Sequence, residues 1–356
     1  MKADKAQQGF ALAAVLWLLA GLTVVVASVS GITLTAAERV AQLRQRADFM
    51  QSAYGTRAHL LYWLSGTGTD ANSFTDDVKR VRADGADYQV MPGSTVSLQD
   101  VGGLIGLNAP NRPLLSTFLQ TCGIDGSAVD PLIDTLEDYT DGDDLVRTQG
   151  AEREAYEAKS LAPPRNAPLL SVSELWGVMG WADVRPTLEA SHCDQAFTVE
   201  ESAARDPNPA TAPPSVLRAQ GVPDDVIQAA AQEGRDDPVE LQATMNRLAA
   251  LSGREAGLSG ASYVVQRTLR IIHRQADNGP WRLQYTLRLT PDVEGRPWQI
   301  VEPSTRAVAS ETSAASSPST SPSPSAAEPQ SSHRVLPWPD TPPAKQISNV
   351  KKLLSF

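Results

Sequence analysis

The clearest pattern in the chain is a long apolar run near its start. From Ala6 to Ala37 there is no charged side chain, and Phe10 to Ile32 is almost wholly apolar or small. A hydrocarbon core of about 30 Å needs roughly 20 helical residues, so this run predicts a membrane-spanning helix. Lys2 and Lys5 precede it, and the positive-inside tendency then places the N-terminus in the cytoplasm and the rest outside.

The helical pattern continues beyond the apolar run. Apolar residues recur at spacings of three and four up to Leu64, and Gly66 and Gly68 come directly after them. These residues are Val40, Leu43, Ala47, Met50, Tyr54, Leu61 and Leu64. We therefore predict one helix from about Phe10 to Leu64, hydrophobic all round in its first half and two-faced in its second. A secretory signal cleaved near residues 27–31 is the alternative, although a signal peptide should not share its helical phase with the mature chain.

Alternating apolar and polar residues predict an antiparallel sheet late in the chain. Trp281 to Leu289 has a period of two, Tyr263 to Ile271 supplies a preceding strand, and Asn278-Gly279 between them is hairpin chemistry. Weaker strand candidates are Tyr88 to Met91, Ser94 to Leu98 and Trp298 to Val301. We expect this sheet to pack on the amphipathic half of the long helix.

The middle of the chain, from about Asn108 to Gly253, has short helical patterns separated by Gly, Pro and Asp. Ser171 and Glu174 have the spacing of a capping box and predict a helix that ends at Gly180. The predicted fold class is α+β, with a long N-terminal helix packed on an antiparallel sheet and a large inserted α-helical domain. A helix-hairpin-helix module for nucleic acid is the alternative, but a net charge of −10 provides no basic footprint.

Two features of composition complete this picture. Residues 303–343 are dense in Ser, Pro, Ala and Thr, which predicts disorder, while Ile347 to Phe356 regains apolar character and is a candidate docking helix. The two cysteines, Cys122 and Cys193, are too few for a disulfide scaffold. Either one disulfide or two buried thiols is compatible with the sequence.

The N-terminal segment resembles a type IV pilin-like precursor. In that family a basic leader is cut after a Gly, which corresponds to cleavage between Gly9 and Phe10, and the new N-terminus, Phe10, is methylated. Most members carry Glu at the fifth mature position, where this chain has Ala14, and a carboxylate in a bilayer is costly unless paired. The absence of that Glu, together with the run from Ala14 to Leu19, resembles the K-type minor pseudopilins of type II secretion systems.

A second stretch carries the same resemblance. The acidic run from Asp138 to Asp144, followed by Gly150-Ala151-Glu152, is similar to a K-type pattern, as are Leu107 to Ala109 and Asn166 to Leu175. The resemblance covers roughly residues 9–301. It implies a leader at 1–9, a long helix at 10–65 with its transmembrane part at 10–32, a sheet domain at 66–107 and 254–302, and an inserted helical domain at 108–253. The disordered tail at 303–356 is predicted from composition and is not explained by the resemblance.

The acidic stretch is also a candidate metal site. Its carboxylates are Asp138, Asp141, Asp143, Asp144 and Glu152. Oxygen-rich clusters suit calcium, although the spacing is not that of an EF-hand. From composition alone a solvated acidic loop is an equal alternative; because members of the K-type family resemble calcium-binding proteins in this region, the resemblance favours a structural calcium ion.

No catalytic site is found in the sequence. The histidines form no metal-binding pair at helical spacing, and Ser259 in Gly257 to Gly260 falls short of a nucleophile elbow. We therefore expect a protein that is not an enzyme.

The resemblance implies a single-pass protein of the inner membrane whose C-terminal part lies in the periplasm. It would form the tip of the pseudopilus with minor pseudopilins I and J, support protein export across the outer membrane, and be placed to contact the secretin and exoproteins, without binding nucleic acid. The expected partner-binding residues are Val40, Leu43, Ala47, Met50 and Tyr54. The alternatives are a membrane-anchored periplasmic binding or adaptor protein unrelated to pili and a secreted hydrolase.

Overall fold

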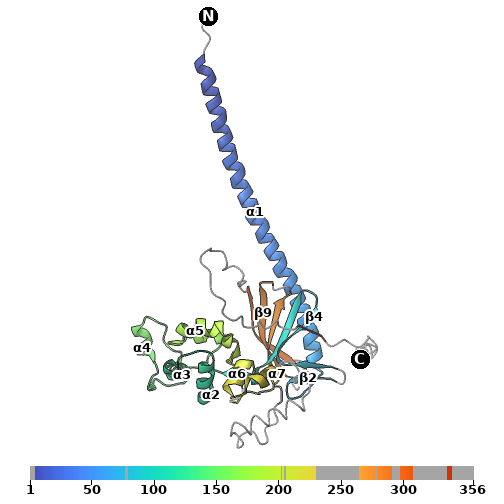
Figure 1. The fold of residues 1–356 in the computed structure, drawn as a ribbon, viewed down its shortest axis with the longest axis vertical. Coiled ribbons are helices and arrows are strands. Elements are labelled where there is room, and N and C mark those ends of the chain that lie inside the picture. The colour runs from blue at the N-terminus through green and yellow to red at the C-terminus, as the bar shows by residue number, and fades with distance from the viewer. Residues whose placement is uncertain are drawn as a thin grey trace, which may run out of the picture.

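Helix α1 (Lys5–Leu64) is a 60-residue rod that projects far beyond the rest of the molecule (Figure 1). At 1.5 Å per residue it is about 90 Å long. It begins five residues before the predicted start at Phe10, because no proline interrupts helical geometry between Lys5 and Phe10. It ends before Gly66, as predicted. This computed structural model describes residues 5–76, 79–201, 203, 206–229, 264–276, 279–290, 297–307 and 335–338.

The described side chains in the apolar half of α1 are all exposed. From Ala14 onward the helix is long and apolar enough to cross a membrane, judged by length and composition. Large side chains such as Val15, Trp17 and Leu22 are exposed along this part. The chain therefore has an N-terminal helix that is compatible with a single-pass anchor.

The C-terminal half of α1 packs on the sheet, as predicted for the amphipathic part of the helix. Its buried residues are Phe49, Ala53, Thr56, Leu60, Leu61 and Leu64. Of the predicted stripe, Leu61 and Leu64 are buried with them, Met50 is half-buried, and Val40, Leu43, Ala47 and Tyr54 are exposed. The end of the stripe therefore meets the sheet, while most of the sheet contact is made by a second set of residues that the stripe did not include.

The main sheet has six strands in the order β10-β9-β8-β5-β4-β11, all antiparallel except the β11–β4 pair. The bounds are β4 Asp84–Met91, β5 Ser94–Asp100, β8 Thr268–Gln275, β9 Trp281–Leu289, β10 Trp298–Ala307 and β11 Leu336–Pro337. The predicted antiparallel pair is confirmed as β8–β9, in which Leu269 faces Leu287 and Ile271 faces Tyr285. All four side chains are buried in the core beneath α1. The first strand begins at Thr268 and continues to Gln275, later than the predicted span from Tyr263 to Ile271. Tyr263 and Asn278 lie outside the described residues.

Three weaker strand predictions are also confirmed, as β4, β5 and β10. The expected disordered tail, in contrast, does not start at residue 303, since β10 continues to Ala307 and β11 joins the sheet beyond residue 334. Pairing with β9 and β4 orders these residues although their composition is typical of disorder. The candidate docking helix at Ile347 to Phe356 lies outside the described residues.

The helical domain lies to one side of the sheet, away from the projecting half of α1 (Figure 1). Its elements are η1 Val101–Gly103, β6 Ile105–Gly106, α2 Arg112–Thr121, α3 Gly126–Thr140, α4 Arg153–Ala158, η2 Val172–Gly177, α5 Trp181–Ala190, η3 Cys193–Ala196, β7 Phe197–Thr198, α6 Pro214–Ala219 and α7 Asp224–Ala229. A small sheet of β1 Gly68–Thr69, β2 Ser73–Thr75 and β3 Arg80–Arg82 precedes it. The domain has its own core around Phe118, Trp181 and Phe197.

The predicted capping box forms differently. Residues Val172–Gly177 make a 3-10 helix, and the Ser171 hydroxyl lies 2.7 Å from the Ser173 hydroxyl instead of capping a backbone N–H. The Glu174 carboxylate accepts from the backbone N–H of Leu170 at 2.8 Å and pairs with Arg165 at 3.1 Å. The spacing correctly predicted a helical turn, but the Ser171 side chain contacts Ser173 and does not cap the helix.

The cysteines, whose state the sequence left open, form a disulfide. Cys122 at the end of α2 is bonded to Cys193 at the start of η3, across a sequence separation of 71 residues. Both half-cystines are buried in the core of the helical domain. A disulfide of this kind is typical of proteins that fold in an oxidising compartment.

Polar side chains join the helical domain to the sheet. Asp100, at the end of β5, is fully buried and accepts hydrogen bonds from the Gly102 N–H and the Thr211 hydroxyl, at 2.9 Å each. Burial outweighs these bonds and raises the pKa of Asp100 to about 6. Arg270 on β8 donates to the carbonyls of Gln195 and Phe197.

Candidate functional site

Helix α3 presents a row of carboxylates on one face. Asp130, Asp134, Glu137, Asp138 and Asp141 succeed one another along the helix, mostly at spacings of three or four, with Asp141 as the C-cap. Asp134 and Asp138 are buried, so both need partners to remain charged. The row shares Asp138 and Asp141 with the acidic stretch from which the sequence predicted a metal site.

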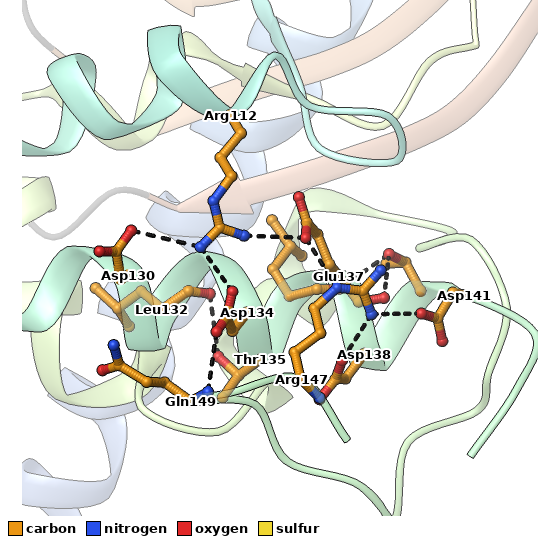
Figure 2. Close-up of polar contacts among 12 residues, drawn as sticks. Arg112, Asp130, Leu132, Asp134, Thr135, Glu137, Asp138, Asp141, Arg147 and Gln149 are labelled. Atoms are coloured by element: carbon orange, nitrogen blue, oxygen red, sulfur yellow. Dashed lines mark hydrogen bonds and ion pairs between the residues drawn. The ribbon is translucent and has the colours of Figure 1, made fainter. Parts of the chain in front are cut away.

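Arg112, near the start of α2, neutralises the first half of this row (Figure 2). Its guanidinium lies 2.6 Å from an oxygen of Asp134 and 3.1 Å from one of Glu137, with Asp130 at 3.4 Å. Asp134 also accepts from the backbone N–H of Gln149 at 2.9 Å. The first carboxylates are therefore used to fasten α2 and the loop after α3 to this helix.

Arg147 occupies the second half of the row (Figure 2). Its Nη1 lies 2.7 Å from Asp138 Oδ1 and 2.6 Å from Asp141 Oδ2, and its Nε lies 3.0 Å from Glu137. The backbone N–H of Arg147 donates to the other oxygen of Asp138 at 3.2 Å. A single guanidinium thus lies between two of the five predicted calcium ligands.

The Gly150-Ala151-Glu152 segment closes against the same carboxylates. A Cβ added to Gly150 would lie 1.8 Å from Asp138 Oδ2, so only glycine fits there, and Ala151 is buried. Glu152 is 5% exposed, and neither of its carboxylate oxygens has a hydrogen-bond partner. Burial raises its pKa to about 7, with repulsion from Asp138, Asp141, Asp144 and Asp143 adding to the shift.

The last two predicted ligands lie at the exposed turn after α3. Asp143 accepts from the backbone N–H of Leu145 at 2.9 Å, and Asp144 accepts from the side-chain amide of Asn166 at 2.9 Å. Asn166 has a positive φ of 49° and its own Oδ1 is buried without a partner. Sequence reasoning missed Asn166 as a site residue, although the run that begins with it was noticed for its resemblance.

The oxygen atoms of this region are of the kind that calcium binds, but their positions in this structure do not form a calcium site. Glu152, Asp141 and Asn166 each have a buried oxygen without a partner, and such oxygens are what a hard cation binds. Across the described ranges, however, no three His, Cys, Asp or Glu side chains converge closely enough to hold a metal ion. Arg147 supplies the positive charge between Asp138 and Asp141.

The predicted processing and partner-binding residues all lie on α1. Gly9 and Phe10 fall within the helical backbone, and their side chains are outside the description. Val40, Leu43 and Tyr54 present exposed apolar surface. Beyond them, a groove of about 310 Å³ runs between α1 and β10 and is lined by Tyr54, Arg57, Ala58, Leu61, Tyr62, Ser65 and Trp298. The exposed side of α1 is therefore available to another chain.

Other candidate residues lie apart from one another. His59 is on α1, His192 precedes η3, and His273 is buried on β8, where its Nε2 lies 3.1 Å from the Tyr285 hydroxyl. His333 and Ser259 lie outside the described residues.

Comparison with known proteins finds a match for the central segment of the chain. Residues 99–185 match the family model described as type II secretion system (T2SS), protein K. These residues run from the end of β5 into α5 and include the carboxylate row, Arg147 and Gly150 to Glu152. No curated protein shows significant similarity to the chain.

Among solved structures, a chain of the GspK-GspI-GspJ complex from the enterotoxigenic Escherichia coli type 2 secretion system is similar. The alignment covers 74% of this chain and 99% of the other, at 13% identity and a TM-score of 0.45. The match to the family model covers residues 99–185, about a quarter of the chain.

Proposed function

We propose that this chain, which carries the protein K domain of type II secretion systems, is a minor pseudopilin at the tip of the pseudopilus. It assembles there with minor pseudopilins I and J and supports protein export across the outer membrane. The observation that carries the proposal is α1, a 60-residue helix whose apolar half is exposed. It projects beyond the sheet and the helical domain, which together form the head of the molecule (Figure 1). Such a helix can be held in a bilayer and then packed among the helices of a filament.

The role is structural, and assembly depends on helix packing. The chain is inserted in the inner membrane by residues 10–32, with its head in the periplasm, the leader is removed after Gly9 and Phe10 is methylated. Mass analysis of the N-terminus of the chain purified from cells tests this directly. A methylated Phe10 supports a pseudopilin, an uncut start supports a permanently anchored adaptor, and a cut near Gly31 supports secretion.

The partners I and J bind the exposed side of α1. Both names occur in the solved complex to which this chain is similar, and Val40, Leu43, Ala47 and Tyr54 are exposed on that side, with Met50 half-buried. The head at the tip is placed to contact exoproteins and the secretin. We expect Leu43→Arg to abolish co-purification with I and J, because a guanidinium would enter an apolar helix contact. The control Gln42→Arg adds the same charge one residue off the stripe and should leave the complex intact.

The protein K domain binds one structural calcium ion. Asp138, Asp141, Asp143, Asp144 and Glu152 are the carboxylates available, and the partnerless oxygens of Glu152 and Asp141 support the proposal. The ion would supply the positive charge that Glu152 lacks; Arg147 already faces Asp138 and Asp141. Calcium saturation should raise the melting temperature of the full-length chain by roughly 5–10 °C relative to a chelator, the shift expected when a ligand is present at about 100 times its Kd.

A matched pair of variants locates the ion. Glu152→Gln should remove the calcium-dependent shift, whereas Glu154→Gln, an exposed carboxylate two residues away, should keep it. An identical melt with calcium and with chelator would contradict calcium binding but leave the pseudopilin role standing.

A further inference from the structure

Residues Val335 to Trp338 lie at the edge of the sheet opposite to the strand that precedes them. β10 ends at Ala307 on one edge, and β11 lies beside β4 on the other. The 27 residues 308–334 connect them and can reach roughly 90 Å when extended, whereas the sheet is about 24 Å wide. The length of the connection therefore does not determine the position of Val335 to Trp338. Their position depends on the contacts that they make.

The backbone contacts of this segment are few. Leu336 lies opposite Tyr88 and Pro337 opposite Gln89 in a parallel pair, and the Trp338 N–H points at the Gln89 carbonyl at 3.4 Å. Proline has no N–H to donate, so the ladder cannot extend through it. Hydrogen bonding marks the register, but the side chains must supply most of the binding.

The side chain of Trp338 fills an aromatic groove, which we define as His59 and Trp63 of α1 with Tyr88 of β4. The Trp338 ring meets these three edge to face at centroid distances of 6.1, 5.4 and 5.8 Å, and Trp338 is 8% exposed. Edge-to-face contacts of this kind are favourable geometries for aromatic pairs. Leu336 packs against the same core.

Trp63 and Tyr88, which line the aromatic groove, are held in place by hydrogen bonds to other residues. The Trp63 indole N–H donates to Asp76 Oδ2 at 2.7 Å, and the Tyr88 hydroxyl accepts from the backbone N–H of Arg82 at 2.9 Å. Neither bond involves Trp338. The groove is thus built by α1 and the first strands, and it does not need the tail segment to position its walls.

We propose that the aromatic groove and the β4 edge form a binding site for an extended Leu-Pro-Trp segment, filled in cis by Leu336 to Trp338. The segment closes the sheet edge, which would otherwise offer unpaired backbone groups to a strand of another chain. Tethering through residues 308–334 gives the segment an effective concentration on the order of millimolar, which excludes competing strands. This inference goes beyond secretion and does not depend on it.

A labelled peptide with the sequence of Arg334 to Trp338 tests the site. Its fluorescence anisotropy is measured with the full-length chain in detergent, for the wild type, Trp338→Ala and Val335→Ala. We expect Trp338→Ala to bind the peptide at least ten-fold more tightly than the wild type, because its groove is empty. Val335 is 46% exposed, so Val335→Ala should behave as the wild type.

Two further variants separate groove binding from general loosening. Adding Trp63→Ala to Trp338→Ala should return peptide binding to the wild-type level. Trp338→Phe should keep the groove closed, because the indole N–H of Trp338 makes no hydrogen bond and only the ring is needed. If Trp338→Ala does not fold, a chain ending at Ser332 provides the empty groove. Equal affinity for the wild type and the emptied form, or no binding to the emptied form, would overturn the proposal.

Discussion

At the residue scale, Asp138 is the residue around which Arg147 and Gly150 pack at the end of α3. Its carboxylate is fully buried, with Arg147 on one oxygen and the backbone of Gly150 pressed against the other. A buried charge of this kind is tolerated only while its partners stay in place. The Gly-Ala-Glu motif therefore has a packing reason that is independent of any metal.

Gly150→Ala should destabilise the helical domain by about 1–3 kcal/mol, the usual range for overpacking a closed site. The new Cβ cannot fit 1.8 Å from Asp138 Oδ2, so the loop must move and weaken the contacts of Arg147. Urea unfolding of the full-length chain measures the loss. The control is Gly142→Ala in the same loop, where nothing lies within 4 Å of the added methyl group and stability should hold.

The buried carboxylate of Glu152 gives the calcium-free protein a characteristic pH dependence. Its pKa is raised to about 7 by burial and by the neighbouring aspartates, above the unfolded value of about 4.5. Between those pH values the folded state holds a proton that the unfolded state has lost, so stability falls as pH rises from about 5 to 7. Unfolding with chelator at several pH values should reveal this fall, and Glu152→Gln should flatten it. An unchanged slope in the variant would assign the dependence to another group.

At the element scale, one face of α1 packs on the sheet and another is exposed. Phe49, Ala53 and Leu60 lie against the sheet, while Leu43 and Tyr54 are exposed. The helix is also a wall of the aromatic groove through His59 and Trp63. Its lower turns therefore hold the head together, and its exposed side is left for other chains.

The two faces of α1 should respond differently to the same substitution. Leu60→Ala removes a side chain that is 0% exposed and should cost about 2–5 kcal/mol of unfolding free energy. Leu43→Ala removes one that is 63% exposed and should change stability by less than about 0.5 kcal/mol. Equilibrium denaturation in detergent compares them. A large loss for Leu43→Ala would mean that the head reaches further up the helix.

At the scale of the whole molecule, two separate cores are joined by polar contacts. One core lies between α1 and the six-stranded sheet, and the other lies within the helical domain, which the Cys122–Cys193 disulfide closes. Arg270 and Arg288 reach across from β8 and β9, the latter to Glu200 at 2.6 Å. Together with the buried contact between Asp100 and Thr211, these arginines hold the helical domain against the sheet.

Arg270→Gln should loosen the junction more than Arg288→Gln. Arg270 donates to two backbone carbonyls, and hydrogen bonds from charged groups contribute about 1.5–3 kcal/mol each. Arg288 forms an ion pair with Glu200, whose side chain is 9% exposed, but the arginine side chain is 41% exposed, and solvent screening on that side reduces the contribution of the pair. Calorimetry should show the Arg270 variant melting in two steps and the Arg288 variant in one. The reverse order would show that the ion pair holds the domain.

Most elements could be predicted from the sequence because they depend on local periodicity. The end of α1 at Leu64, the β8–β9 hairpin and its inward residues are set by spacings of 3.6 and 2, which need no knowledge of distant partners. The acidic stretch was likewise visible as a cluster in the chain. The length and apolarity of α1, and hence its fitness to cross a membrane, are also properties of the sequence alone.

Tertiary structure decided everything that depends on which segments meet. Two faces of α1 had apolar spacing, and only contact with the sheet chose the one containing Phe49 and Leu60. Cys122 had no sequence signal for Cys193, 71 residues away, nor did Trp338 for Trp63. The partners of a carboxylate are set in the same way, because Asp138 pairs with Arg147 and repels Glu152 only once the loop has folded back. Periodicity specifies an element, but pairing over long distances is decided by packing, which local sequence does not encode.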